Sequence, residues 1–262
     1  MQIADRTPET GTPPAEQNAS GGGSRADLCI VIPVYNEEGA IETVLGKWCA
    51  MLDTLGIRYR IRAYNDGSKD GTGTILQRFA AERPDAVTAV DKPNTGHGPT
   101  ILRGYREAAD GADWVFQIDS DDEMGPESFP GLWARRNEFD FLLGRRTGRV
   151  QPLPRRLVSA VSRMAVRIFY GSGGVWDVNS PYRLMRAETF RPFYRAIPDG
   201  TFAPNVILSG LAARHRLRCL EVPVPQHDRT TGEVSIKNWK LLKAAARSFF
   251  QTVAFALRGG RP

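Results

Sequence analysis

Apolar runs of strand length alternate with amphipathic stretches along the first two thirds of the chain. The runs at residues 28–32 and 114–118 are continuous, which is typical of strands buried on both faces of a sheet. Shorter patterns predict three more strands, at residues 59–64, 87–90 and 141–144. Helices are predicted between the strands, at residues 38–55, 70–83 and 98–109. Strands that alternate with helices predict an α/β fold with a mostly parallel sheet flanked by helices.

The two ends of the chain depart from this pattern. Residues 1–26 are rich in Pro, Gly, Ser and Thr and offer little to a core, so we expect a disordered tail. Residues 27–235 are expected to form one domain. Residues 236–262 combine apolar and aromatic side chains with basic ones at helical spacing, which predicts an amphipathic helix.

Composition excludes several protein classes. With 262 residues, 41% of them hydrophobic and 24% charged, the chain resembles an ordinary globular protein and not a collagen, a coiled coil or a disordered chain. It contains no apolar run of about 18 residues, and its first residues lack the pattern of a secretory signal. The three widely spaced cysteines argue against a disulfide framework or a zinc cluster, so we expect a cytoplasmic, reducing location.

Charge is distributed unevenly along the chain. Residues 1–140 contain 14 Lys and Arg against 23 Asp and Glu, whereas residues 141–262 contain 21 against 6. The basic second half suits an anionic partner, which would be nucleic acid, anionic lipid or a phosphorylated substrate. An uneven solvated surface explains the same numbers equally well.

Polar clusters follow three of the predicted strands, at residues 33–37, 65–68 and 119–123. In open α/β sheets, ligands bind at the carboxyl ends of the strands. The three clusters therefore mark the expected ligand site.

The densest of these clusters, at residues 119–123, is acidic. If the strand geometry continues, Asp119, Asp121 and Glu123 point to one side. Three hard oxygen ligands suit Mg²⁺ or Mn²⁺, and a cation would relieve the repulsion between the carboxylates. The alternative is a solvated acidic loop or helix start, since Asp and Ser cap helices well. The position directly after a buried strand favours the metal site.

Two glycine-containing stretches have both a local and a functional interpretation. Asp66-Gly67 is typical of a turn before a helix, but Asp66 is also placed to accept hydrogen bonds from a base or ribose. Residues 94–98 place two glycines before a helix, where the backbone is able to approach a phosphate. His97 within them is interpreted as a loop residue, not a catalyst.

Four motifs, in this order, resemble those of glycosyltransferase family 2. They are residues 32–38 (IPVYNEE), 65–72 (NDGSKDGT), 94–98 (NTGHG) and 117–121 (QIDSD). The later segments resemble the polyprenyl-phosphate, dolichol-phosphate mannose synthase-like branch. They are residues 144–146 (GRR), 177–184 (DVNSPYRL) and the spaced pattern from His227 through Arg229 to Ser235. The resemblance covers residues 28–240. It implies a GT-A fold, which is a Rossmann-like single domain, and a nucleotide sugar as the donor substrate.

The resemblance also implies roles for individual residues. Five of them would bind the nucleoside: Pro33, Tyr35, Glu37, Asp66 and Asn94. Asp119 and Asp121 would form the Asp-x-Asp motif that holds the metal and the donor diphosphate. Glu123 stands where this branch often has a glutamine ligand, and we expect it to be the third metal ligand.

The acceptor decides which other groups the reaction needs. A lipid phosphate is already ionised, because the second pKa of a phosphate monoester is near ~6, and it needs no protein base. A hydroxyl acceptor needs a carboxylate base, for which Asp177 and Asp122 are the candidates. Asp177 has an equally good structural interpretation, as a turn or cap residue or a partner of Arg183. Arg145 and Arg229 are expected to bind the acceptor phosphate with bidentate geometry.

Together these features predict a metal-dependent, inverting transfer of a hexose from a UDP- or GDP-sugar to a polyprenyl phosphate at the inner face of the cell membrane. The C-terminal helix is expected to touch that membrane, with packing on the domain or an oligomer contact as the alternative. Two other functions stay open: the same fold acting on a soluble or polysaccharide hydroxyl, and a non-catalytic nucleotide-sugar-binding module. Nucleic-acid binding is not expected, because no matching motif accompanies the basic half.

Overall fold

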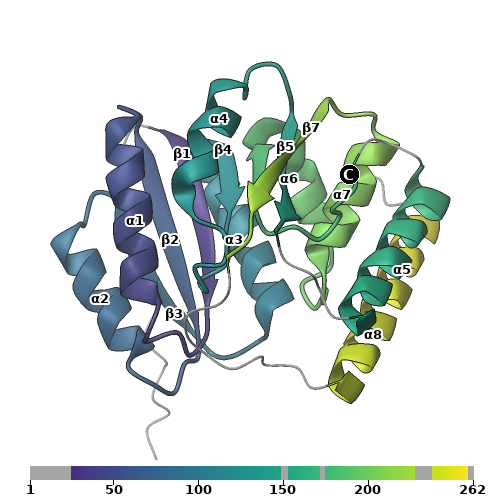
Figure 1. Ribbon diagram of the computed structural model, residues 1–262, viewed down its shortest axis with the longest axis horizontal. Coiled ribbons are helices and arrows are strands. Elements are labelled where there is room, and N and C mark those ends of the chain that lie inside the picture. Colours follow the sequence, from purple (N-terminus) through teal and green to yellow (C-terminus); the bar gives the residue numbers. More distant parts are fainter. Residues whose placement is uncertain (1–24, 149–152, 172–174, 228–237, 259–262) are drawn as a thin grey trace, which may run out of the picture.

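A computed structural model of the chain describes residues 25–148, 153–171, 175–227 and 238–258. They form one seven-stranded sheet of order β3-β2-β1-β4-β6-β5-β7 with helices on both faces (Figure 1). The elements are β1 (Ala26–Val34), α1 (Ile41–Thr54), β2 (Tyr59–Asp66), α2 (Thr72–Glu82), β3 (Val87–Lys92), α3 (His97–Gly111), β4 (Ala112–Gln117), η1 (Pro126–Ser128), α4 (Phe129–Ala134), β5 (Phe141–Thr147), α5 (Leu153–Tyr170), β6 (Arg183–Arg186), α6 (Ala187–Ala196), α7 (Pro204–Arg214), β7 (Cys219–Pro225) and α8 (Asn238–Leu257).

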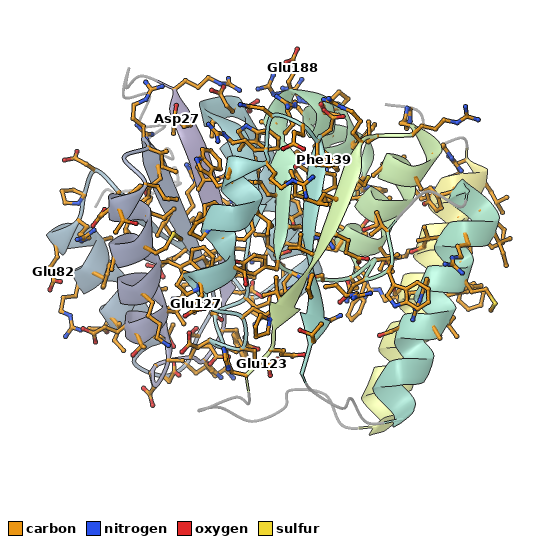
Figure 2. All side chains as sticks on the ribbon, turned by 45° about the horizontal axis from the view of Figure 1, so that its top comes forward. Asp27, Glu82, Glu123, Glu127, Phe139 and Glu188 are labelled. Carbon is orange, nitrogen blue, oxygen red and sulfur yellow. The ribbon has the colours of Figure 1, made fainter. Side chains whose placement is uncertain are left out.

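The sheet is mostly parallel, as the sequence predicts. Strand β1 pairs in parallel with β2 and β4, β2 with β3, and β5 with β7, whereas β6 runs antiparallel to β4 and β5. The parallel strands therefore end at one edge of the sheet. Figure 2 shows Glu123 at that edge and Asp27, at the start of β1, at the opposite edge. We call the former the carboxyl edge.

Strand β1 is the centre of the core because its apolar side chains serve both faces of the sheet. Val31 belongs to the cluster that packs with α3, whereas Ile30 and Ile32 belong to the cluster around Trp48 of α1. Helix α3 lies very close to β1, since a Cβ at Gly104 would stand 2.4 Å from Cγ1 of Val31. This close packing fixes the amino end of α3 at the carboxyl edge.

The structure contains two strands that the sequence pattern did not reveal. Strand β6 follows a turn of mixed polarity and contains Arg183, and β7 contains two prolines and Glu221. Prolines and charged residues weaken the sequence pattern by which a strand is predicted. Both segments are strands in the structure because they pair with β5. The structure also extends β1 back to Ala26, which the sequence assigned to a disordered tail; residues 1–24 of that tail lie outside the described residues.

Helices α5 and α8 lie side by side next to α7, at the end of the molecule farthest from α2 (Figure 1). The hydroxyl of Tyr170 in α5 donates to the carbonyl of Thr252 in α8 at 2.9 Å. Arg214 of α7 donates to the carbonyls of Phe169 and Ala256, one in each helix. The predicted C-terminal helix is therefore present as α8 and packs on α5 and α7.

Candidate functional site

The turn after β1 is fastened to the turn after β2. The amide of Asn36 donates to Oγ of Ser68 at 3.0 Å, and the amide of Glu37 donates to Oγ1 of Thr72 at 2.9 Å. Glu37 is buried, whereas the ring of Tyr35 is 40% exposed at the carboxyl edge. The structure thus places Pro33, Tyr35 and Glu37 at the edge where the sequence predicts the nucleoside pocket; their contact with a nucleoside stays a prediction.

A buried ion pair joins the ends of β2 and β3. The ammonium of Lys92 donates to Oδ1 of Asp66, which also accepts from the amide of Thr95 at 2.8 Å, while Oδ2 accepts from the amide of Gly96 at 2.9 Å. Burial alone would raise the pKa of Asp66, but these hydrogen bonds outweigh it and hold the pKa below its usual value. Asp66 therefore shapes the loop that carries Asn94.

Sequence reasoning missed Lys92, since a lysine at the end of a short strand has no distinctive pattern. Asn94, which is predicted to bind the nucleoside together with Asp66, lies next to the Asp66 turn: a Cβ at Gly67 would stand 2.9 Å from the amide nitrogen of Asn94. Gly67 has a φ of +69°, a conformation that glycine adopts without strain. The two loops therefore approach each other through a position that accepts no larger side chain.

The acidic cluster lines a pocket at the carboxyl edge. Strand β4 ends at Gln117, before the cluster, yet Asp119, Asp121 and Glu123 all line the same pocket. The pocket is lined by Ile118, Asp119, Asp121, Glu123, Met124, Arg146, Pro181, Tyr182 and Gln226. Asp122, which has a φ of +56°, points elsewhere and pairs with Lys47 at 2.5 Å.

Asp119 is held in place by a buried polar cluster. Nε2 of Gln117 donates to Oδ1 of Asp119 at 2.9 Å. Oε1 of the same Gln117 side chain accepts from the hydroxyl of Tyr105 at 2.7 Å and from Nδ2 of Asn205 at 2.8 Å. His97, the first residue of α3, has Nε2 at 3.8 Å from the same Asp119 oxygen. The Asp119 carboxylate is thus oriented before any ligand arrives.

A divalent cation fits part of this pocket. Among the residues that the structure describes, no three His, Cys, Asp or Glu side chains converge to hold a metal ion by themselves. Mg²⁺ and ions like it are commonly held by one or two carboxylates together with substrate phosphates and water. Asp119 and Asp121 in one pocket provide such a pair. Glu123 is engaged by the side-chain amide of Gln226, and its role as a third ligand stays a prediction.

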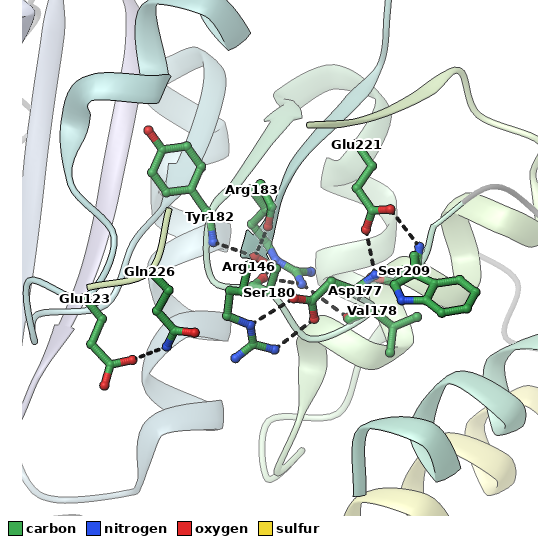
Figure 3. A network of polar contacts seen from close by, with 12 residues as sticks. Glu123, Arg146, Asp177, Val178, Ser180, Tyr182, Arg183, Ser209, Glu221 and Gln226 are labelled. Carbon is green, nitrogen blue, oxygen red and sulfur yellow. Dashed lines mark hydrogen bonds and ion pairs between the residues drawn. The ribbon is translucent and has the colours of Figure 1, made fainter. Parts of the chain in front are cut away.

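Arg146 is the basic side chain of this pocket (Figure 3). Its guanidinium donates to both carboxylate oxygens of Asp177, from Nε at 2.9 Å and from an Nη at 2.8 Å. Burial alone would lower the pKa of Arg146, but Asp177, aided by Asp119 and Glu123, raises it above its usual value. Asp177 therefore pairs with Arg146, and the alternative in which it pairs with Arg183 is wrong.

Arg183 has a different role from the one that the sequence suggested. Its guanidinium is fully buried and donates to the carbonyls of Val178, Ser180 and Asn205. Three carbonyls around one cation fix the turn between Asp177 and β6.

Of the two arginines expected at the acceptor phosphate, only Arg145 lies within the described residues, and it is not placed in the pocket. Arg145 is exposed and is not among the residues that line it, because successive side chains of a strand point to opposite faces. Its neighbour Arg146 takes the position instead. Arg229 lies outside the described residues. The described segment before it ends at His227, whose amide donates to the carbonyl of Glu123 at 2.8 Å.

Comparison with known proteins decides the family. Residues 29–191, more than half of the chain, match the family described as glycosyl transferase family 2. The chain belongs to glycosyl transferase family 2. The resemblance to this family that the motifs suggested is thereby confirmed.

Curated relatives of this family 2 chain are named undecaprenyl-phosphate 4-deoxy-4-formamido-L-arabinose transferases. The protein from Shewanella sediminis is 28% identical over 79% of this chain and 60% of its own length. The protein from Edwardsiella ictaluri is 29% identical over 82% and 64%. The chain thus spans less than two thirds of the length of these relatives.

Solved structures of other glycosyltransferases share the fold of this family 2 chain. Glucosyl-3-phosphoglycerate synthase from Mycobacterium tuberculosis, in complex with Mn²⁺, UDP-glucose and phosphoglyceric acid, has a TM-score of 0.64 at 18% identity over 90% of this chain and 81% of its own. A mannosyltransferase from Pyrobaculum calidifontis, in complex with GDP-Man and Mn²⁺, has a TM-score of 0.55 at 17% identity over 90% and 75%. The GT-A fold predicted from the motifs is therefore confirmed.

Proposed function

We propose that this chain transfers a hexose from a UDP- or GDP-sugar to a polyprenyl phosphate, with inversion and with help from Mg²⁺ or Mn²⁺. The observation that carries the proposal is the pocket itself, in which carboxylates suited to a cation face an arginine suited to a phosphate. The names of the curated relatives, which act on undecaprenyl phosphate, support this class of acceptor. The metal and nucleotide in the titles of the similar structures support the donor side.

The donor side of the pocket follows from the carboxylates. Asp119 and Asp121 would hold the cation, which when bound neutralises charge on the departing nucleoside diphosphate. Tyr35, Glu37 and Asn94 lie at the same carboxyl edge, and Asp66 organises the loop that carries Asn94. These residues would bind and orient the nucleoside so that the sugar carbon faces the acceptor.

The acceptor side follows from Arg146. A guanidinium presents paired donors that match a phosphate monoester, and such contacts are among the strongest hydrogen bonds in proteins. Both oxygens of Asp177 are already occupied by Arg146 at 2.8 and 2.9 Å, and the other candidate base, Asp122, is paired with Lys47. A hydroxyl acceptor would need one of these carboxylates free to take a proton, whereas a phosphate acceptor needs neither. This favours the lipid phosphate over the hydroxyl acceptor.

Two basic helices support peripheral membrane contact. The sequences of α5 and α8 contain five arginines and two lysines and no Asp or Glu. Ile168 of α5 and Phe250 of α8 are 67% and 69% exposed. Both helices begin beyond the carboxyl edge and run back alongside the rest of the molecule (Figures 1 and 2). Apolar and basic side chains together suit an anionic lipid surface.

In the described part of the chain, no helix combines the length and the apolar character needed to cross a bilayer. We therefore propose surface contact through α5 and α8, at the inner face of the cell membrane, as the route by which a lipid acceptor reaches Arg146.

The product tests this function directly. The purified chain is incubated with UDP- and GDP-hexoses, with and without polyprenyl phosphate and Mn²⁺, and products are followed by mass spectrometry. A lipid-linked hexose that needs all three components is expected. Transfer to a soluble or polysaccharide hydroxyl in place of the lipid, or nucleotide binding without any transfer, would favour the two alternatives from the sequence.

A further inference from the structure

We infer that Glu221 is a positioning residue that holds Asp177, and through it Arg146, in the orientation that receives the acceptor phosphate. This inference rests on the proposed function, because it names the residue that sets the acceptor side of the same pocket. Glu221 itself is not among the residues that line the pocket.

Glu221 reaches Asp177 from a neighbouring strand. In the sheet, Glu221 of β7 stands beside Leu143 of β5, three residues before Arg146. One carboxylate oxygen of Glu221 accepts from the amide of Asp177 at 2.6 Å, and the other accepts from the amide of Trp176 at 3.3 Å. Figure 3 shows the chain of contacts that runs from Glu221 through Asp177 to Arg146.

The carboxylate of Glu221 accepts hydrogen bonds from backbone amides and does not pair with a basic side chain among the described residues. Across the described residues, Glu221 forms no salt bridge, and its hydrogen bonds go to the two amides at and before Asp177. A carboxylate that accepts from backbone N–H groups makes a charge-assisted bond, roughly twice as strong as a neutral one. The two bonds together fix the backbone that carries Asp177.

This anchoring matters because Arg146 has competing partners. Asp119 and Glu123 line the same pocket and, like Asp177, stabilise its charge. If the backbone at Asp177 were released, the guanidinium would be drawn toward the acidic cluster. It would then leave the acceptor side. Glu221 prevents this loss by keeping the Asp177 carboxylate in place.

A merely structural role for Glu221 predicts something different. Loss of a structural contact would lower the unfolding temperature and weaken donor and acceptor binding alike. A positioning role predicts a selective loss on the acceptor side that passes through Arg146. The two roles therefore differ in which ligand is affected and in whether the effect survives removal of Arg146.

The test uses farnesyl phosphate, a short polyprenyl monophosphate, titrated calorimetrically into the full chain. Glu221→Ala is expected to weaken its binding about tenfold, the size of one weakened charge-assisted contact, with UDP or GDP binding unchanged. Glu221→Gln keeps one oxygen acceptor and is expected to restore most of the affinity. In an Arg146→Ala background, Glu221→Ala is expected to cause no further loss, because coupled residues are not additive. Glu82→Ala, on an exposed helix end, is the matched control.

Two results would overturn the inference: equal losses of farnesyl phosphate and nucleotide binding, or a full additional loss in the Arg146→Ala background. Should Glu221→Ala fail to fold, Glu221→Gln gives the test at a smaller amplitude: the remaining loss must fall on farnesyl phosphate and not on the nucleotide, and it must vanish in the Arg146→Ala background. Failure of the proposed function looks different, since the unaltered chain would then bind no farnesyl phosphate, and the inference would fall with it.

Discussion

Lys92 and Asp66 form an ion pair inside the carboxyl edge of the sheet, where each side chain is only 5% exposed. Lys92 also donates to Oγ1 of Thr95 and Oγ1 of Thr100. One lysine thereby ties the end of β3 to the turn after β2 and to the amino end of α3. The loop that would bind the nucleoside depends on this pair.

Removing one partner of the pair should be costly. Lys92→Met leaves a buried carboxylate without its cation, and we expect the free energy of unfolding to fall by about 3–5 kcal/mol. Chemical denaturation with urea measures this difference. Lys47→Met removes the partner of Asp122 in a more exposed pair and is the matched control, for which a loss below about 1 kcal/mol is expected. Equal losses in the two variants would contradict the assigned importance of the Asp66 pair.

Asp66 also makes stability depend on pH. Its pKa is lower in the folded chain than the ordinary 3.8, so the unfolded chain binds a proton first as the pH falls. The contribution of Asp66 is therefore complete above about 3.8 and is lost below that value, as the pH approaches the lower folded pKa. Urea unfolding of the unaltered chain and of Asp66→Asn between pH 6 and pH 3 checks this. The variant is expected to lose less stability on acidification, and parallel curves would contradict the assignment.

The buried amide of Gln117 should control metal affinity. Gln117→Leu removes the hydrogen bond that orients Asp119, and outer-shell contacts of this kind are worth about 10- to 100-fold in metal affinity. Titration of Mn²⁺ into the chain with UDP or GDP present, followed by electron paramagnetic resonance, measures the change. Tyr105→Phe keeps Gln117 itself and is expected to have a smaller effect. Unchanged Mn²⁺ binding in Gln117→Leu would argue against Asp119 as a ligand.

Contact of α5 and α8 with anionic lipid should respond to charge on their exposed faces. The pair Ile168→Glu and Phe250→Glu replaces two exposed apolar side chains by acids, and we expect binding to anionic vesicles to fall about tenfold or more. Co-sedimentation with phosphatidylglycerol vesicles measures this, with phosphatidylcholine vesicles as the lipid control. Thr88→Glu, an exposed site on β3 at the far end of the sheet, is the protein control. Equal vesicle binding by all variants would contradict the proposal that α5 and α8 contact the membrane surface.

Asp177 tests the choice between the two acceptors. If Asp177 only holds Arg146, Asp177→Asn keeps the shape and one acceptor oxygen, so KM for the lipid phosphate rises while kcat changes little. If Asp177 were a base, kcat would fall by the 10²–10⁴-fold that such catalysis contributes. Steady-state rates with saturating donor distinguish the two outcomes.

The sequence was sufficient for the parts of this site that depend on local pattern. The continuous apolar run at residues 28–32 and the acids after the run at 114–118 located the carboxyl edge and its acidic pocket. It could not identify the partners of Asp66 and Asp177, because Lys92 and Arg146 come from other strands and are 26 and 31 residues away. The sequence could not show that Arg146, and not Arg145, lines the pocket, for a related reason. Which of two successive strand residues faces a pocket depends on the register of β5, and a one-residue shift exchanges them.

The central claim is that Arg146 receives the acceptor phosphate, and the adjacent arginines of β5 provide the most direct measurement. Steady-state kinetics with polyprenyl phosphate should show that Arg146→Ala raises acceptor KM by about tenfold or more, while Arg145→Ala changes it by less than about threefold. Both variants should keep the donor KM, since neither side chain is placed at the nucleoside. Equal effects of the two substitutions, or a larger effect of Arg145→Ala, would contradict the account.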